Sequence, residues 1–335
     1  MTVRIGLIGC GVMGTDHAMI IGQQLHGAEL AMVCDADAGR ARVAAEQAGC
    51  ARIEGDPLAV INAPSVDAVL IASPDQTHGP LTLACLAAGK PVLCEKPLSQ
   101  AASECEAIVE SEVKRGKRLV QVGFMRRFDP SYVEMRQAVL AGTIGRPLML
   151  HCFHRNVAAP DWFTGQMAIT NSAPHEFDIA RFLLGGELVA VTAFQPALRR
   201  EKGGVAPVFM VCETAAGQLV NIEINNNAGY GYDVRGEIVG ERGAVSMAAP
   251  AGSTLDLHLS HSVAYAADWR PRFAEAYRRQ NQAWVNGIAS GTSAGSSAWD
   301  GLCATLVAEA AVQSLQTGQR TPIRIPVRPG LYDHS

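Results

Sequence analysis

The sequence VRIGLIGCGVMG, residues 3–14, decides the fold class of the amino-terminal part of this chain. An apolar run, Ile5–Ile8, leads into a turn with glycines at positions 9, 11 and 14, and a helical pattern follows. Glycines at this spacing allow a tight turn and a close approach of the backbone to a pyrophosphate, which the helix N-terminus then holds. The motif alone is a weak signal, but its position between a strand and a helix predicts a dinucleotide-binding turn.

Asp35 strengthens this interpretation, because it stands 21 residues beyond Gly14 at the end of the next apolar run. A carboxylate there can accept hydrogen bonds from ribose hydroxyls and repels a 2′-phosphate, so the sequence favours NAD over NADP. Arg40, one turn into the next helix, would weaken this preference, although we expect its side chain to point more often to solvent. The alternative is that Asp35 merely caps the helix that follows it.

Short apolar runs alternate with helical patterns over the first 120 or so residues. Continuously apolar runs of four or five residues are typical of buried parallel strands. Strands alternating with helices predict an α/β fold, a doubly wound parallel sheet of the Rossmann type. The expected strands are Ile5–Ile8, Leu30–Cys34, Ala68–Ala72, Pro91–Cys94 and Leu119–Val122, and the expected helices include Ala38–Gln47 and Gln76–Ala88.

The pattern changes after about Gly123, where longer strand-like runs follow one another without helices between them. Such runs predict a large open, mostly antiparallel sheet in an α+β domain. We therefore expect a nucleotide-binding domain over residues 1–122 and a substrate-binding and oligomerisation domain over 123–335. The expected elements are a helix over Pro130–Ala141, strands over Pro147–His154, Leu188–Gln195, Val208–Cys212, Leu219–Asn225 and Arg235–Val239, a loop from Ser290, and a helix over Ala298–Gln316.

Composition excludes several classes of function. The chain has 335 residues, 18% of them charged, and a net charge of −4 without a basic block, so we expect no nucleic-acid partner. Neither a signal peptide nor an apolar run long enough to cross a membrane is visible. The nine cysteines are scattered and never form Cys-x-x-Cys, which is typical of reduced thiols in the cytoplasm and argues against zinc. His151 and His154 cannot share a metal, because residues three apart on a strand face opposite sides.

Lys96 is the first candidate for chemistry. It follows the strand-like run that ends at Cys94, and the carboxyl ends of strands in such a sheet meet at the ligand-binding crevice. Pro97 fixes its own φ and turns the chain there, which holds Lys96 in place. We expect Lys96 to polarise a substrate oxygen beside the cofactor rather than to form a surface ion pair. Ser73, Pro74 and His78 follow another strand at the same edge; His78 is more often a loop-packing residue than a base.

Seven motifs spread over the whole chain form one set: the glycine turn, Glu95–Pro97, Gln121–Phe128, His151–Asn156, His175–Asp178, Tyr230–Asp233 and Glu237–Gly243. With them the chain resembles the glucose–fructose oxidoreductase and inositol dehydrogenase family. Glu-Lys-Pro is shared across the wider family, whereas Phe-Met-Arg-Arg, His-Arg-Asn and Tyr-Gly-Tyr-Asp favour inositol-type substrates. The resemblance implies a nucleotide-binding domain joined to an open-sheet domain, with substrate held between them and subunits associated through the outer face of the sheet.

The resemblance also implies roles for individual residues. The family's catalytic lysine falls on Lys96 and its catalytic histidine on His175, while the aspartate four residues before that histidine falls on Asn171. An asparagine can orient His175 or bind substrate, but it cannot exchange a proton or stabilise an imidazolium by charge. The expected substrate-binding residues are Lys96, Arg126, His154, Asn156, Asn171, His175, Asp178 and Tyr232, and the expected cofactor-binding residues are Gly9, Gly11, Val12, Met13, Gly14, Asp35, Ser73, Pro74, His78, Glu95 and Lys96.

The chemistry expected of this set is the oxidation of a secondary alcohol. It needs a hydride acceptor and a base whose pKa is near neutrality, which suits a histidine. We expect an NAD-dependent enzyme that oxidises a ring hydroxyl of an inositol and works as a homodimer or homotetramer. The alternatives are a pyranose dehydrogenase of the same family and a catalytically silent NAD-binding sensor.

Overall fold

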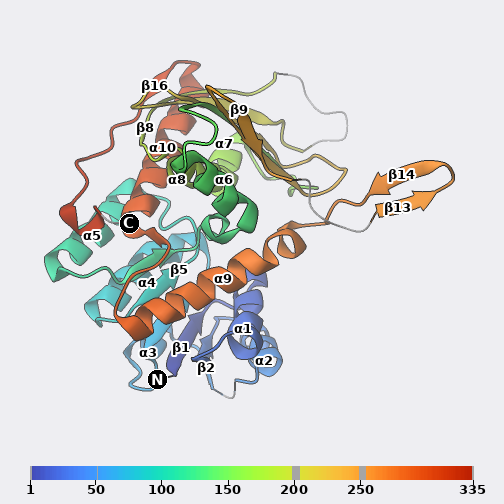
Figure 1. The fold of residues 1–335 in the computed structure, drawn as a ribbon. Coiled ribbons are helices and arrows are strands. Elements are labelled where there is room, and N and C mark those ends of the chain that lie inside the picture. The colour runs from blue at the N-terminus through green and yellow to red at the C-terminus, as the bar shows by residue number, and fades with distance from the viewer. Residues whose placement is uncertain (1, 51, 198–203, 249–253, 334–335) are drawn as a thin grey trace. The chain divides into compact units, whose positions relative to one another are not determined.

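A computed structural model describes residues 2–50, 52–197, 204–248 and 254–333 (Figure 1). The chain divides into two compact units, each of which is described by itself. The first contains Met1–Phe128, Glu275–Thr305 and Pro326–Ser335, and the second contains Asp129–Ala274 and Leu306–Ile325. The predicted single domain boundary after residue 122 differs from this division, because the first unit also contains two segments from later in the sequence. Their sequences show no such return, because it depends on contacts between distant parts of the chain.

The first unit is built on a seven-stranded sheet in the order β15-β6-β5-β4-β1-β2-β3. Its strands β1 to β6 are all parallel, and only β15 joins antiparallel, at the edge. The order reverses between β1 and β4, which is the position where such sheets bind ligands at the carboxyl ends of their strands. The strands are β1 Val3–Ile8, β2 Ala28–Cys34, β3 Ile53–Glu54, β4 Ala68–Ile71, β5 Val92–Cys94, β6 Val120–Val122 and β15 Ser296–Ser297.

Helices cover this sheet in two packed groups. Helices α1 and α2 pack together, and α3 packs against α4, which packs against α5, as expected when right-handed crossovers run in opposite directions from the switch point. The doubly wound parallel sheet is confirmed, although α3 and α5 extend the expected set of helices. The helices of this sheet are α1 Val12–Gln24, α2 Ala38–Ala48, α3 Pro57–Asn62, α4 His78–Ala87 and α5 Ala102–Arg115, with short 3₁₀ turns η1 Asp75–Thr77 and η2 Met125–Phe128.

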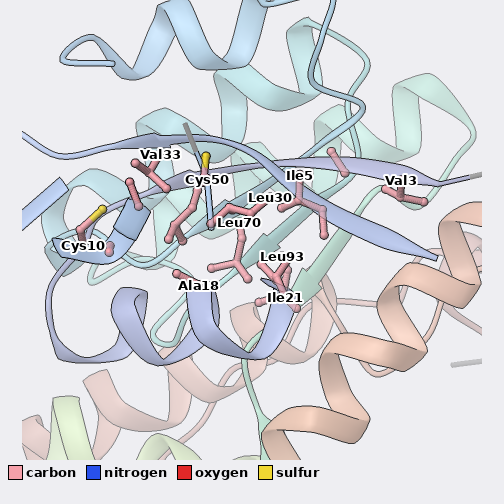
Figure 2. Packing of buried hydrophobic residues seen from close by; sticks show 14 of the residues in the cluster. Val3, Ile5, Cys10, Ala18, Ile21, Leu30, Val33, Cys50, Leu70 and Leu93 are labelled. Atoms are coloured by element: carbon pink, nitrogen blue, oxygen red, sulfur yellow. The ribbon is translucent and has the colours of Figure 1, made fainter. Parts of the chain in front are cut away.

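The core between α1 and the central strands contains side chains from both (Figure 2). Ile5 and Leu70 from neighbouring strands are completely buried, and Ile21 of α1 lies in the same cluster. Trp284 of α9 (Trp269–Ser290) also belongs to this cluster, so the later part of α9 packs with the amino-terminal strands. Each such side chain contributes on the order of 1.5–3 kcal/mol of hydrophobic stabilisation. This packing explains why the segment from Glu275 belongs to the first unit.

The second unit contains a seven-stranded sheet in the order β12-β11-β7-β10-β9-β8-β16. Only β7 and β10 run parallel, so the expected open, mostly antiparallel sheet is confirmed. Alternate residues of its strands are buried, and α8 (Pro174–Leu184) packs against β7 while α6 (Pro130–Leu140) packs against β12. The strands are β7 Pro147–Arg155, β8 Leu188–Phe194, β9 Val208–Thr214, β10 Leu219–Asn225, β11 Asp233–Gly240, β12 Ala244–Ser246 and β16 Thr321–Pro322.

The remaining elements include several that the sequence pattern did not predict. Helix α9 was not expected, although its sequence is strongly amphipathic, and neither was the exposed hairpin of β13 and β14. The loop after Ser290 is short and leads into β15 before α10 begins. The remaining elements, predicted and unpredicted together, are α6 Pro130–Leu140, α7 Gly165–Met167, the π-helical turn η3 Ala168–Ser172, α8 Pro174–Leu184, β13 Thr254–Leu257, β14 Ser260–Val263, α10 Ala298–Thr317 and η4 Gly330–Tyr332.

Candidate functional site

The glycine turn of the first unit is shaped by backbone packing at the switch point. Gly9 has φ of +95°, and a Cβ there would overlap the backbone of Ala72 and Ser73 beyond β4. A Cβ on Gly14 would overlap the Gly9 carbonyl, whereas a Cβ on Gly11 would meet nothing within 4 Å. The turn is thus closed against the sheet at Gly9 and Gly14 and open at Gly11.

Helix α1 starts directly after this turn and has no side-chain cap at its N-terminus. The first backbone N–H groups of a helix have no partner within the helix and carry a partial positive charge. An uncapped N-terminus behind a turn that leaves Gly11 open fits the pyrophosphate of a dinucleotide. Val12 and Met13 begin the helix, so their expected cofactor contacts are backbone contacts.

Asp35 lies just beyond β2, with a side chain that is only 9% exposed. Its Oδ2 accepts a hydrogen bond from Cys10 N at 2.7 Å, and its Oδ1 accepts one from Asp37 N at 2.8 Å. Oδ2 retains a second lone pair for a ribose hydroxyl. The Arg40 guanidinium is 57% exposed, in line with the expectation that it points to solvent, but it also lies 3.2 Å from Oδ1. It pairs with Asp35, which places a cation beside the ribose-recognition position.

His78 opens α4 and is a loop-packing residue, as its sequence context favoured. The ring is 1% exposed, with Nδ1 2.7 Å from the Pro97 carbonyl oxygen and Nε2 2.9 Å from the Ser73 carbonyl oxygen. Burial alone would lower the pKa of His78, but Cys94 and these two carbonyls outweigh it and raise the pKa to about 10. An imidazolium satisfies both carbonyls at once, so His78 ties the loop after β4 to the loop after β5.

The segment after β5 carries Glu95 and Lys96. Lys96 is partly exposed, whereas Glu95 is 5% exposed and its Oε1 lies 2.8 Å from His17 Nε2. The other ring nitrogen of His17, Nδ1, lies 2.9 Å from Asn281 Nδ2. Sequence reasoning missed both His17 and its partner Asn281. His17 lies three residues beyond Gly14 in an otherwise ordinary helix, and Asn281 lies 264 residues from His17, so neither carried a signal. Arg126, in η2, is 1% exposed and belongs to the same unit.

In the second unit, three predicted residues share one side of a continuous helical path. Asn171 lies in the π-helical turn η3, and His175 and Asp178 lie in the first turns of α8, where Pro174 occupies the expected N-terminal position. Residues at spacings of three and four face the same way on a helix. Thr170 Oγ1 donates to Asn171 Oδ1 at 2.8 Å, which fixes how the amide of Asn171 is turned. π-turns often occur at functional sites, and this one contains Asn171.

His154, on β7, and Tyr232, just before β11, come to the same place. The rings of His154 and His175 have centroids 6.3 Å apart, and Tyr232 meets His154 edge-on at 6.1 Å. His154 Nδ1 lies 3.1 Å from Glu176 Oε2, a carboxylate that is 1% exposed and that sequence reasoning missed. The sequence signal that could have identified Glu176 was its position directly after His175. Asn156 follows β7 and is partly exposed. Its backbone N–H donates to the Asn225 carbonyl, and its carbonyl accepts from the Ala228 N–H.

Two negative observations concern the residues that the structure describes. Among them, no group of three or more histidine, cysteine or acidic side chains is placed to hold a metal ion. On β7 the buried residues alternate with partly exposed ones, so His154 is buried while His151 faces the other side and contacts Asn221. None of the described helices is both long enough and apolar enough to span a bilayer. All nine cysteines are free and buried.

Comparison with known proteins gives full-length matches. The chain is 49% identical over 335 residues to inositol 2-dehydrogenase 1 of Saccharopolyspora erythraea, covering 99% of each chain, and 41% identical to an inositol 2-dehydrogenase of Burkholderia cenocepacia, again over 99% of each. Its fold matches myo-inositol dehydrogenase of Lactobacillus casei in complex with NAD(H) and myo-inositol, with a TM-score of 0.94, 29% identity, and coverage of 99% and 100%. It also matches scyllo-inositol dehydrogenase of that organism, with NAD(H) and scyllo-inositol bound, at a TM-score of 0.88, 25% identity, and coverage of 96% and 99%.

Two family models match successive parts of the sequence. Residues 3–124 match the oxidoreductase family with an NAD-binding Rossmann fold, and residues 132–246 match the GFO/IDH/MocA C-terminal domain. The matched residues include the glycine turn and Lys96 in the first part, and Asn171 and His175 in the second. The chain therefore belongs to the GFO/IDH/MocA oxidoreductases, whose amino-terminal domain is an NAD-binding Rossmann fold.

Proposed function

We propose that this protein oxidises one ring hydroxyl of an inositol, myo-inositol or an isomer, to the keto-inositol with NAD as oxidant. The observation that carries the proposal is full-length similarity to proteins named inositol dehydrogenases, in a chain that keeps Lys96 after β5 and His175 at the start of α8. The pyranose dehydrogenase alternative is not favoured, because the relatives reported above are inositol dehydrogenases. A silent sensor is not favoured either, since both candidate catalytic residues are present.

NAD, when bound, accepts a hydride from the carbon that bears the reacting hydroxyl. The chain's residues have two tasks in that step: to move the hydroxyl proton and to stabilise charge that develops on oxygen. Lys96 supplies an ammonium that hydrogen-bonds the oxygen, and His175 takes the proton with a ring nitrogen. The C–H and O–H bonds break, the C=O bond forms, the hydride leaves with its electron pair, and the proton stays on His175. Asn171, being neutral, orients without sharing the proton.

An inositol presents only hydroxyl groups, so its site must be lined with hydrogen-bonding side chains. In the second unit, Asp178 is 1% exposed, His154 5% and Tyr232 3%, and all three accompany His175. These side chains can all exchange hydrogen bonds with hydroxyl groups, so a polyol suits this lining better than an apolar alcohol. Arg126 and Asn156 complete the proposed substrate contacts.

We also propose that the protein is a cytoplasmic homo-oligomer, a dimer or tetramer. The sheet of the second unit has an outer face where Phe194 lies opposite Phe209 in register, with these side chains 51% and 41% exposed. On that face Arg155 and Arg235 both stack on Phe153, at 5.4 and 4.8 Å from its ring. Aromatic residues mixed with arginine are typical of protein interfaces. Nine free, buried thiols support a reducing compartment.

A substrate panel tests the proposed reaction. NAD reduction is expected with one or more inositol isomers, at a kcat/KM well above that for any aldopyranose. Lys96→Met should lower kcat by about 10²-fold or more, the effect of losing one preorganised electrostatic donor, while NADH binding is nearly unchanged. Lys90→Met, at the opposite end of the same strand, is the matched control and should keep its turnover. Preference for an aldopyranose, or normal turnover by Lys96→Met, contradicts the proposal.

Cofactor choice is expected to depend on Asp35. The wild-type protein should bind NADH more tightly than NADPH, and Asp35→Ser should narrow the ratio because the repulsion of the 2′-phosphate is lost while Arg40 remains. Fluorescence titration with both nucleotides measures the ratio directly. Asp37→Ser is the control: it keeps an N-cap on α2 and should leave the ratio unchanged. A wild-type preference for NADPH would sink the assignment.

The pair of Asn171 and His175 predicts a pH effect. Oxidation should follow one rising limb as His175 loses its proton, and His175→Ala should reduce kcat by about 10²–10⁴-fold. Asn171→Asp places an anion beside the imidazole, favours its charged form and moves the limb to higher pH. The measurement is kcat against pH for wild type and both variants. Superimposed profiles for wild type and Asn171→Asp show that the two side chains do not communicate.

Oligomerisation through the outer face predicts a simple change of mass. Light scattering after gel filtration should find a dimer or tetramer for the wild type. Phe209→Glu should dissociate it, because a charge would be buried at the interface without a partner. Leu140→Glu, at an exposed position on α6, is the control and should leave the mass unchanged. A monomeric wild type at micromolar concentration rules the interface out.

A further inference from the structure

Glu95 is a carboxylate buried in the first unit, next in sequence to the candidate catalytic lysine. It is 5% exposed, and its Oε2 lies 3.2 Å from the backbone N–H of Lys96. A Cβ on Gly123, beyond β6, would lie 2.9 Å from the Glu95 carboxyl carbon, so the glycine provides the space that this side chain occupies. Burial of an ionised carboxylate is costly unless hydrogen bonds and opposite charge compensate for it.

His17 supplies that compensation from α1. Its ring is completely buried, and Nε2 lies 2.8 Å from Glu95 Oε1. The tautomer follows from the other ring nitrogen, because Nδ1 lies 2.9 Å from the amide nitrogen of Asn281. An amide nitrogen only donates, so Nδ1 accepts and the proton sits on Nε2, aimed at Glu95. The Asn281 oxygen faces Gln280, which supports this orientation of the amide.

We propose that Asn281, His17 and Glu95 form a buried hydrogen-bond relay that keeps the Glu95 carboxylate ionised and fixed beside Lys96. His17 and Asn281 are then positioning residues, and the relay rests on the proposed role of Lys96. Three elements distant in sequence, α1, the segment after β5, and α9, contribute one member each. A carboxylate fixed beside Lys96 restricts where its ammonium can lie, and a preorganised ammonium is what polarises an oxygen.

The groups around Glu95 agree with this assignment. Burial raises the pKa of Glu95, but the hydrogen bond from His17, the charge of Lys96 and the backbone N–H of Lys96 together lower it below the ordinary value. His17 and Lys96 are the titratable groups that face the carboxylate, Asn281 is neutral, and Gly123 contributes only backbone. Tyr277 meets the His17 ring edge-on at 5.7 Å and holds it by packing.

The wild-type protein provides the first test, independent of any substrate. ¹⁵N NMR of protein labelled at histidine should show His17 as a neutral ring protonated on Nε2, with its signal assigned by its loss in His17→Gln. Infrared spectroscopy should find Glu95 ionised at neutral pH, assigned with Glu95→Gln. A His17 proton on Nδ1, or a protonated Glu95, overturns the relay whatever the enzyme oxidises.

Measurements of turnover distinguish a positioning role of His17 from a packing role. His17→Leu removes the donor, so the pKa of Glu95 should rise and a second acidic limb should appear in the kcat profile beside that of His175. The kcat at neutral pH should fall by about 10- to 100-fold, the effect of losing a hydrogen bond to a charged group. His17→Gln retains an amide donor and should recover much of the loss. NADH affinity should change little in either variant. The exposed His26→Leu is the matched control and should behave as wild type.

The outcomes distinguish the relay from the proposed function. If His17→Leu folds, binds NADH and keeps the wild-type profile, the relay is wrong while Lys96 can still be catalytic. Equal losses in His17→Leu and His17→Gln show a packing role and also overturn it. If His17→Leu does not fold, His17→Gln and the wild-type spectra decide the question. An absence of inositol oxidation refutes the proposed function alone, because the spectra still test the relay.

Discussion

The close packing of the Gly9 turn against the chain that leaves β4 is the constraint on which the rest of the first unit depends. β1 and β4 are neighbours in space but are separated by two strands and three helices in sequence. Gly9 and Gly14 can lie at their shared edge only because neither carries a Cβ. That packing directs the N-terminus of α1 toward the carboxyl edge of the sheet, where β2 presents Asp35 and β5 presents Lys96. One steric condition therefore sets the position of the cofactor-binding groups and of the lysine.

The parts of the fold that could be predicted are those where one local pattern determines the outcome. Strands such as Ala68–Ile71 are buried on both faces, so their sequence is continuously apolar, and their ends were located to within a residue or two. The π-turn at Asn171 and the two-residue strand β15 could not be predicted, because each is formed by contacts made elsewhere. Helix α9 was missed despite its amphipathic sequence, since four arginines and two glutamines lie among its first fourteen residues.

The candidate site shows the same difference between features set by local sequence and features set by distant contacts. Lys96 could be located from the strand before it and the proline after it, whereas its surroundings could not. His17 contacts Glu95 from 78 residues away and Asn281 from 264, and no spacing rule connects them. Arg40 illustrates a contact that a correct expectation of exposure did not predict. Its position on a helix indicated solvent exposure, which is correct, yet an exposed guanidinium can still reach a neighbouring carboxylate because its stem is long and flexible.

Buried carboxylates in both units are compensated by a histidine of the same unit. Glu95 is met by His17 in the first, and Glu176 by His154 in the second. Local compensation means that neither charge depends on a bound ligand for its partner, so the polar groups can be in place before a polyol arrives. In the second unit the ring paired with Glu176 lies 6.3 Å from His175, which puts a compensated acidic group close to the proposed base. The neutral amide of Asn171 therefore adds orientation without adding a further charge to an already buried cluster.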